Sequence, residues 1–155
     1  MAAVIRKARR NDLVSIVKLW REMWDLHAEL DPRLAAAPSE RAMRDVLTDH
    51  YESDDSCILV ADEGAGLVGY CLGVILENPP VEPDPRFGYV SDLAVTASAR
   101  GHGLGAKLLD EAHAWFKAQG VTRAEVQVSS VNLKAASFWK RRGYSDFLLR
   151  LRKTL

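Results

Sequence analysis

The stretch Arg100-Gly101-His102-Gly103-Leu104-Gly105 combines residue types that suit the binding of an anion. Its three glycines let the backbone approach a ligand with no Cβ in the way. The apolar spacing that follows predicts a helix from Gly103 to Gln119, and a helix start carries free N–H groups and a partial positive charge. We therefore predict a phosphate site, with Arg100 and His102 as further donors. The alternative is a glycine-rich turn that only joins a strand to a helix.

Other classes of site are disfavoured by the sequence. The loop is neither GxxxxGK[ST] nor GxGxxG, which argues against nucleoside triphosphates and dinucleotides. Lys+Arg and Asp+Glu balance at 21 each, and no basic patch with interleaved aromatic residues indicates nucleic acid. No apolar run reaches the ~18 residues of a membrane span. We expect no metal site, because Cys57 and Cys71 lie apart in apolar runs.

Cellular location is predicted from the same features. Met1 to Arg10 carries early charges and no apolar core of a signal peptide. Cys57 and Cys71 are expected to be buried free thiols, as is typical of a reducing compartment. We therefore expect a cytoplasmic protein.

Periodicity and turn residues predict the elements that would position the loop. Strands are expected at 4–9, 57–61, 67–76, 87–95, 124–128 and 147–155. Helices are expected after Asn11 or Asp12, after Ser39, from Gly103 to Gln119 and at 132–142. The 155 residues suit one domain, 1–155, with one core. This order predicts an α/β fold with one mixed sheet, helices on both faces and a parallel strand pair around the Gly103 helix.

Three motifs together resemble the GNAT superfamily of N-acyltransferases. They are Asp92-Leu93-Ala94-Val95, Arg100-x-x-Gly103-x-Gly105 and Asn132-x-x-Ala135-x-x-Phe138-x-x-x-x-Gly143-Tyr144. The resemblance implies a mostly antiparallel GNAT-like sheet in which one parallel pair splays apart. It also implies acetyl-CoA as cosubstrate, with its pyrophosphate on Arg100, Gly101, His102, Gly103, Leu104 and Gly105. Leu93, Ala94 and Val95 would pair with the pantetheine arm, and Asn132 would contact that arm, cap its helix, or do both.

The proton-handling residues of the family are not all present. Many relatives have Glu at the position of Ser91, and some have Glu at the position of Gln127. Many have Tyr at the position of Trp139, whose indole N–H cannot supply an acid proton. Two catalytic candidates remain close to the motifs. Asp92 is expected to act as base or water-holder, or else as a structural carboxylate. Tyr144 is expected to act as acid, or else as a core aromatic residue.

The resemblance implies an acetyl-CoA-dependent N-acetyltransferase that acts on a primary amine. The acceptor is a small amine, an amino acid or a peptide N-terminus, and it attacks directly in a ternary complex. His27 and Glu29 are expected in the acceptor wall, although His27 also fits the end of a packed helix face. The alternative is a non-catalytic acyl-CoA-binding regulatory module. We also expect a homodimer, because the strand at 147–155 is apolar on both faces.

Overall fold

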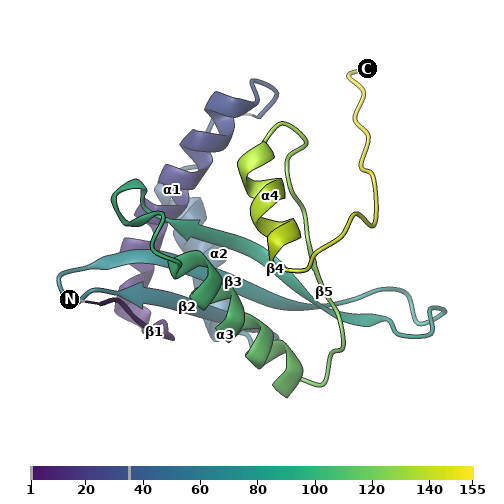
Figure 1. Cartoon of the computed structure of the whole chain (residues 1–155), viewed down its shortest axis with the longest axis horizontal. Coiled ribbons are helices and arrows are strands. Elements are labelled where there is room, and N and C mark those ends of the chain that lie inside the picture. The colour runs from purple at the N-terminus through teal and green to yellow at the C-terminus, as the bar shows by residue number, and fades with distance from the viewer. Residues whose placement is uncertain (1, 35) are drawn as a thin grey trace.

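A five-stranded sheet forms the centre of the protein, whose computed structural model describes residues 2–34 and 36–155 (Figure 1). The strands are β1 (Val4–Lys7), β2 (Ser56–Asp62), β3 (Leu67–Glu77), β4 (Arg86–Val95) and β5 (Ala124–Val126). They lie in the order β1-β2-β3-β4-β5, antiparallel except for the parallel β4–β5 pair. The predicted mixed sheet with one parallel pair is confirmed.

Helices cover both faces of this sheet. They are α1 (Leu13–Leu30), α2 (Glu40–Glu52), α3 (Leu104–Ala118) and α4 (Leu133–Arg141). Helices α1 and α2 bury Ile16 and Met43 against Tyr70 on one face of the sheet. Helices α3 and α4 bury Phe116 and Trp139 on the other face. The sheet is therefore the middle layer of the fold, and a residue of β3 or β4 faces one helix pair or the other.

The central strand β4 contains a bulge and then separates from β5. Leu72 of β3 pairs with Asp92 and the adjacent Gly73 pairs with Val90, so Ser91 is the extra residue of the bulge. Pairing with β5 extends only from Gly88 to Val90. Among the described residues, the end of β4 therefore has β3 on one side and no strand on the other, as the predicted splay requires.

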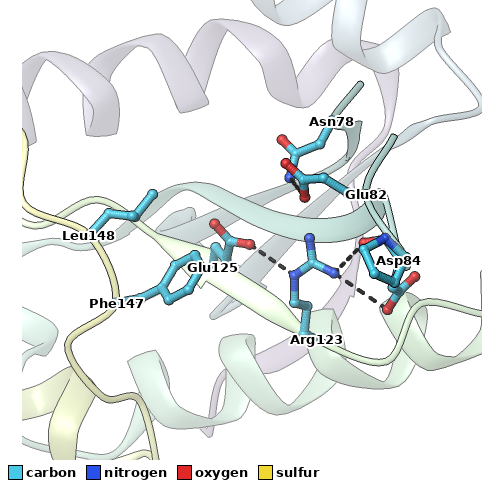
Figure 2. Close-up of a pocket in the computed structure, with 8 residues that line it drawn as sticks. Asn78, Glu82, Asp84, Arg123, Glu125, Phe147 and Leu148 are labelled. Atoms are coloured by element: carbon cyan, nitrogen blue, oxygen red, sulfur yellow. Dashed lines mark hydrogen bonds and ion pairs between the residues drawn. The ribbon is translucent and has the colours of Figure 1, made fainter. Parts of the chain in front are cut away.

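The C-terminal tail (residues 145–155) corrects the sequence interpretation. The alternating pattern predicts a last strand at 147–155, and this prediction is wrong for the single chain, where the tail is in no strand. Phe147, Leu149 and Leu151 are 73%, 82% and 83% exposed. The physical reason is the lack of a neighbour, because strand propensity is realised only where backbone groups find partners. A cavity of about 480 Å³ lies where the tail passes β5, with Phe147 and Leu148 on one side (Figure 2).

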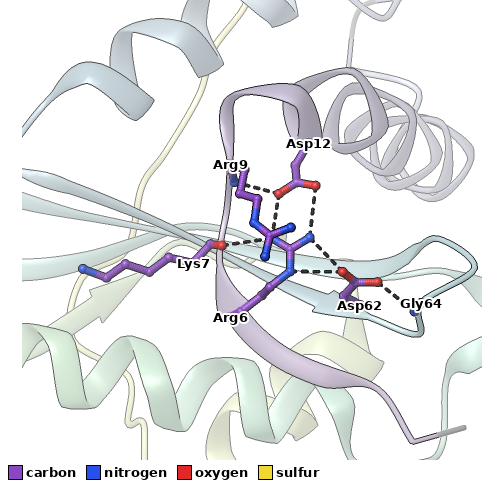
Figure 3. A network of polar contacts seen from close by, with 6 residues as sticks. All are labelled: Arg6, Lys7, Arg9, Asp12, Asp62 and Gly64. Atoms are coloured by element: carbon purple, nitrogen blue, oxygen red, sulfur yellow. Dashed lines mark hydrogen bonds and ion pairs between the residues drawn. The ribbon is translucent and has the colours of Figure 1, made fainter.

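An arginine-centred network fixes the start of α1 to the sheet edge. Arg6 of β1 donates to the Asp12 and Asp62 carboxylates, at 2.7 and 2.8 Å (Figure 3). The bond from Arg6 holds the pKa of Asp12 below its usual range. Asp12 also accepts a 2.7 Å bond from the N–H of Arg9, so it caps the 3-10 turn η1 (Arg10–Asp12). The side chain of Asp12 does not cap α1, whereas the side chain of Ser39 caps α2 by accepting from the N–H of Ala42.

Candidate functional site

The glycine loop has the backbone geometry that a bound anion requires. Gly101 and Gly103 adopt φ values of +83° and +76°, and a Cβ added at either would meet no atom within 4 Å. Side chains rarely adopt this conformation, so glycine is needed at both positions. The first hydrogen bond of α3 runs from the N–H of Lys107 to the carbonyl of Gly103, so the amides of residues 104–106 precede it. Open space therefore faces a positive helix end.

Three other residues of the loop have different surroundings. Leu104 is buried and anchors the start of α3 in the core. A Cβ at Gly105 would make an ordinary 3.7 Å contact with the Phe138 ring, so glycine is not strictly required there. His102 is exposed, with its Nδ1 atom 3.4 Å from the carbonyl oxygen of Ala99. The imidazole therefore lies at the surface of the loop, where it can turn toward an anion.

Arg100 and Glu22 connect this loop to α1. Arg100 donates from Nε to the carbonyl of Val95 at 2.8 Å, and its Nη2 atom lies 3.5 Å from Glu22. Glu22 also accepts bonds from the Thr96 hydroxyl and the Ala97 N–H, at 2.8 and 2.9 Å. A helix residue thus holds the segment between β4 and the loop. Sequence reasoning missed Glu22, because its partners lie more than seventy residues away.

The free edge of β4 leads directly into the loop. Leu93, Ala94 and Val95 pair with β3 on one side. Alternate residues of a strand direct their N–H and C=O groups to opposite neighbours, so part of this backbone points toward the gap beside β5. The predicted pantetheine-binding residues therefore lie at an edge with unpaired backbone groups.

Asp92 faces the α1/α2 side of the sheet, beside a buried tyrosine. Burial raises the pKa of the Asp92 carboxyl from 3.8 to about 6, while the Tyr70 hydroxyl and the charge of His27 act in the opposite direction. The Tyr70 hydroxyl is buried and has no partner at hydrogen-bonding geometry among the described residues. A buried donor beside a desolvated carboxyl is a place for a water or a polar ligand. Tyr70 gave no sequence signal, because it reads as an ordinary strand residue.

The two predicted acceptor-wall residues differ in position. His27 donates from Nδ1 to the carbonyl of Met23 at 2.8 Å, which leaves Nε2 as the other polar atom of the ring. It lies near enough to Asp92 to influence the pKa of that carboxyl. Glu29 is exposed in the last turn of α1. The structure therefore brings His27 and Asp92 together and leaves Glu29 at the surface.

Tyr144 lies on the other side of the sheet from Asp92. It packs with the cluster beneath α3 and α4, with its ring 5.0 Å from that of Trp139 in an edge arrangement. Its hydroxyl shares a 2.7 Å hydrogen bond with Nε2 of His113. Burial raises the pKa of Tyr144 and lowers that of His113. This arrangement favours a packing role for Tyr144 over the acid role, and its partner His113 was not found from the sequence.

Asn132 occupies the start of α4, as expected. Its side chain accepts a 3.1 Å bond from the N–H of Ala135, and the residue is nearly buried. The predicted capping role is confirmed, and contact with a pantetheine arm stays a prediction.

Known proteins share this arrangement. Residues 13–144 match the model of the Acetyltransferase (GNAT) family. The chain belongs to the GNAT acetyltransferase family. It is 25% identical over 143 residues to the uncharacterized N-acetyltransferase YhfO of Bacillus subtilis (strain 168). The aligned region covers 92% of this chain and 89% of the relative. Family membership supports an acyl-CoA-dependent acetyltransferase, as the motifs implied.

Solved structures show the same GNAT fold. A tetramutant of the BH1408 protein from Bacillus halodurans superimposes with a TM-score of 0.88 at 21% identity, over 98% of this chain and 99% of that one. A predicted acetyltransferase from Clostridium acetobutylicum, determined with acetyl-CoA, superimposes with a TM-score of 0.79 at 17% identity, over 97% and 96% of the two chains. At these identities the likeness concerns the fold.

The residues of this GNAT acetyltransferase fit acetyl-CoA as cosubstrate. The open space above Gly101 and Gly103 is one that a Cβ would fill, and the unpaired edge of β4 leads into it. Cys57 and Cys71 are free and buried, and burial raises the pKa of both thiols. Within the described ranges, no three His, Cys, Asp or Glu side chains gather as metal ligands would. Among those same residues, none of the helices has the length and apolar character to cross a membrane.

Proposed function

We propose that this GNAT protein moves the acetyl group of acetyl-CoA to a primary amine by direct attack in a ternary complex. The observation that carries the proposal is one continuous segment of chain. It holds the desolvated Asp92, the unpaired edge at 93–95 and the open glycine loop before α3. A small amine, an amino acid and a peptide N-terminus are the acceptor classes that we consider.

Each part of that segment has one binding task. Residues 100–105 would hold the pyrophosphate with backbone amides and with the side chains of Arg100 and His102. Leu93, Ala94 and Val95 would pair with the pantetheine arm, and Asn132 would contact it from α4. When bound, acetyl-CoA supplies a thioester carbon that an uncharged amine can attack, with a thiolate as leaving group. A backbone N–H on the free edge of β4 would stabilise the developing oxyanion.

Asp92 is the group that we assign to proton transfer. An amine with a pKa of ~10.4 is almost fully protonated at pH 7, so it must lose a proton before it attacks. Because the pKa of Asp92 is about 6, its carboxylate is charged at neutral pH and is a stronger base than an ordinary aspartate. The unpaired hydroxyl of Tyr70 would orient a water between carboxylate and amine. The thiols are protonated and buried, which supports direct attack without a covalent enzyme intermediate.

The test is a release assay with purified protein. Acetyl-CoA is mixed with a polyamine, free amino acids or a peptide with a free N-terminus, and free thiol and acetylated product are both measured. We expect thiol release that depends on one acceptor class and falls in Asp92→Asn. Binding of CoA by calorimetry without any transfer would instead favour the non-catalytic acyl-CoA-binding module. The sequence features that support this non-catalytic alternative are Ser91, Gln127 and Trp139, because they replace residues that are common in relatives.

We also propose a cytoplasmic homodimer. The two free thiols support a reducing compartment. The exposed apolar side chains of the C-terminal tail support self-association, because a monomer rarely leaves so many together in water.

A further inference from the structure

Tyr89 and Asp92 lie on the same face of β4, the face that α1 and α2 cover. A Cβ at Gly88 would overlap the ring of Phe116, and Val90 packs in the same cluster, so both point toward α3. Tyr89 lies between them and therefore points to the opposite side. Burial raises the pKa of Tyr89, and the charge of Asp92 raises it further, so the two side chains are neighbours.

The chain along β5 presents further polar side chains to this face. Ala124 and Val126 pack in the cluster beneath α3, so Glu125 and Gln127 point the other way. Val126 is the last residue of β5 that pairs with β4, and the two chains separate beyond it. Gln127 therefore lies across the resulting gap from Asp92, which follows the last paired part of β4.

The C-terminal tail brings an arginine to this gap. Arg150 donates from Nη1 to Oε1 of Gln127 at 3.3 Å. Two residues later, Arg152 donates from Nη1 to the carbonyl of Arg33 at 3.2 Å. The tail thus links the side of β5 to the chain just after α1 (Figure 1). The charge of Arg150 opposes the rise in the pKa of Tyr89, so its guanidinium lies on the same face of the sheet.

The charge of Arg150 is not neutralised by a carboxylate of the chain. Its hydrogen bond goes to a neutral amide, and among the described residues no acidic side chain forms an ion pair with it. Glu125, the nearby acid on β5, pairs instead with Arg123 at 3.0 Å. A guanidinium has five N–H donors, so most of those of Arg150 are available to a ligand. Their planar arrangement matches the two oxygens of a carboxylate.

We propose that the acceptor is a free amino acid, with its carboxylate bound by Arg150 and its amine directed toward Asp92. The inference rests on the transferase function proposed above and narrows its acceptor to one class. The two sides of the gap carry opposite charges, as the two ends of an amino acid do. A polyamine would instead bring a second cation close to Arg150, and a peptide N-terminus has an uncharged amide where the carboxylate would be.

Binding in this direction places the nitrogen at the thioester. The amino acid enters with its amine as an ammonium, which loses two protons in all. One passes through water to Asp92 and on to solvent before the attack. The nitrogen then forms the C–N bond to the acetyl carbon, the C–S bond breaks, and the leaving thiolate takes the second proton. The products are an N-acetyl amino acid and CoA.

The first experiment measures binding without transfer. Wild type is saturated with CoA, which has no acetyl group, and free amino acids are added in calorimetry, each beside its own C-terminal amide. The amide keeps the amine and the side chain and lacks only the carboxylate. We expect at least one amino acid to bind ~10-fold or more tightly than its amide, as is typical of a hydrogen bond between charged groups. Equal binding within every pair, or binding only of spermidine or of a peptide with a free N-terminus, would overturn the inference, and so would no binding of any amino acid.

The second experiment replaces the arginine. Arg150→Met should lower the affinity for the amino acid to about that for the amide, and should leave the affinity for the amide unchanged. Arg150→Lys keeps the charge without the paired donors, so it should restore part of the difference. Arg141→Met is the matched control, because Arg141 is also exposed and donates to a neutral side chain, the Ser137 hydroxyl, at 2.8 Å. An equal loss in Arg150→Met and Arg141→Met, or an equal loss for amino acid and amide, would contradict the assignment of Arg150.

Initial rates of thiol release with acetyl-CoA separate this inference from the transferase proposal. In Arg150→Met the KM for the amino acid should rise ~10-fold or more with kcat little changed, because the carboxylate is bound alike before and during the attack. The carboxylate also raises the pKa of the neighbouring amine, so reactivity alone would favour the amide. Binding of the amino acid without any transfer would refute the transferase function and support the carboxylate site. Transfer to the amide with the same kcat/KM as to the amino acid would refute the carboxylate site and support the transferase function.

Discussion

Replacing Asp92 by Asn should stabilise the protein while it impairs the reaction. Burial raises the pKa of this carboxyl from 3.8 to about 6, so the folded chain holds the proton more tightly than the unfolded chain. Unfolding between pH ~4 and ~6 therefore releases a proton, and stability falls as pH rises through this window. At ~1.4 kcal/mol per pKa unit, the charged carboxylate opposes folding by at most ~3 kcal/mol above pH 6.

Asn has nearly the same shape and carries no charge. Asp92→Asn should therefore gain ~1–3 kcal/mol of unfolding free energy at pH 8, the lower value allowing for the lost attraction between the carboxylate and the nearby Tyr70 hydroxyl and His27. At pH 4, where Asp92 is largely protonated, the gain should nearly vanish. For a chain of this length, the gain at pH 8 corresponds to a rise in Tm of several degrees. The kcat/KM of Asp92→Asn should be ~100-fold below that of the wild type, which is the effect typical of losing a general base.

Urea unfolding of wild type and Asp92→Asn at pH 4, 6 and 8 measures the gain in unfolding free energy. The difference between the two chains isolates the contribution of Asp92 from that of the other carboxylates. Initial rates with one amine from pH 6 to 10 measure the fall in kcat/KM. The wild-type rate should rise toward the pKa of the amine without a narrow bell, and Trp139→Phe should lose much less activity, through packing alone. A variant that is less stable at pH 8 would show an ion-paired structural carboxylate, and full activity would remove Asp92 from the mechanism.

Three further predictions use matched variants. Gly103→Ala should weaken CoA binding at least tenfold by calorimetry, whereas Gly120→Ala, with a similar φ of +80° and the same open space, should lose similar stability and no affinity. Equal affinities would place the cofactor elsewhere. Arg6→Met should lower the unfolding free energy by about 1–2 kcal/mol in urea titrations, because it removes the ion pairs of Arg6 with Asp12 and Asp62. Arg10→Met, whose ion pair with Glu52 is exposed to water, should change the unfolding free energy much less than Arg6→Met does. Tyr144→Phe should keep most activity in the thiol assay, and a rate loss comparable to that of Asp92→Asn would restore its acid role.

The site features visible in the sequence are those encoded by neighbouring residues. Glycines with positive φ at 101 and 103 and the apolar repeat of α3 lie within one short stretch, so the anion loop could be predicted. The bonds of Glu22 to Thr96 and of His113 to Tyr144 join residues 74 and 31 positions apart. No local pattern encodes such pairs, because they arise only when helices pack on the sheet.

The side of the sheet on which a residue lies was the harder question. Asp92 and Tyr144 are both candidates in the sequence, since both belong to the family motifs. The bulge at Ser91 changes the alternation along β4 and leaves Asp92 in register with Leu72, on the face covered by α1 and α2. Tyr144 follows α4 and packs on the opposite face. A one-residue bulge thus determines the face of the sheet on which Asp92 lies, and a sequence pattern with a period of two cannot show it.

For the C-terminal tail, the sequence pattern could not show whether a predicted strand forms at all. Its alternation of Phe147, Leu149 and Leu151 with Leu148 and Arg150 is typical of a strand, and the single chain contains no strand there. Strand propensity reflects how side chains fit a pleated surface, so it predicts a strand only if a neighbouring edge is available. In the described part of the chain no strand edge pairs with residues 147–155, so the pattern is not realised there. Whether an edge lies beside a segment is decided by how distant parts of the chain pack, and an alternating pattern with a period of two carries no information about that.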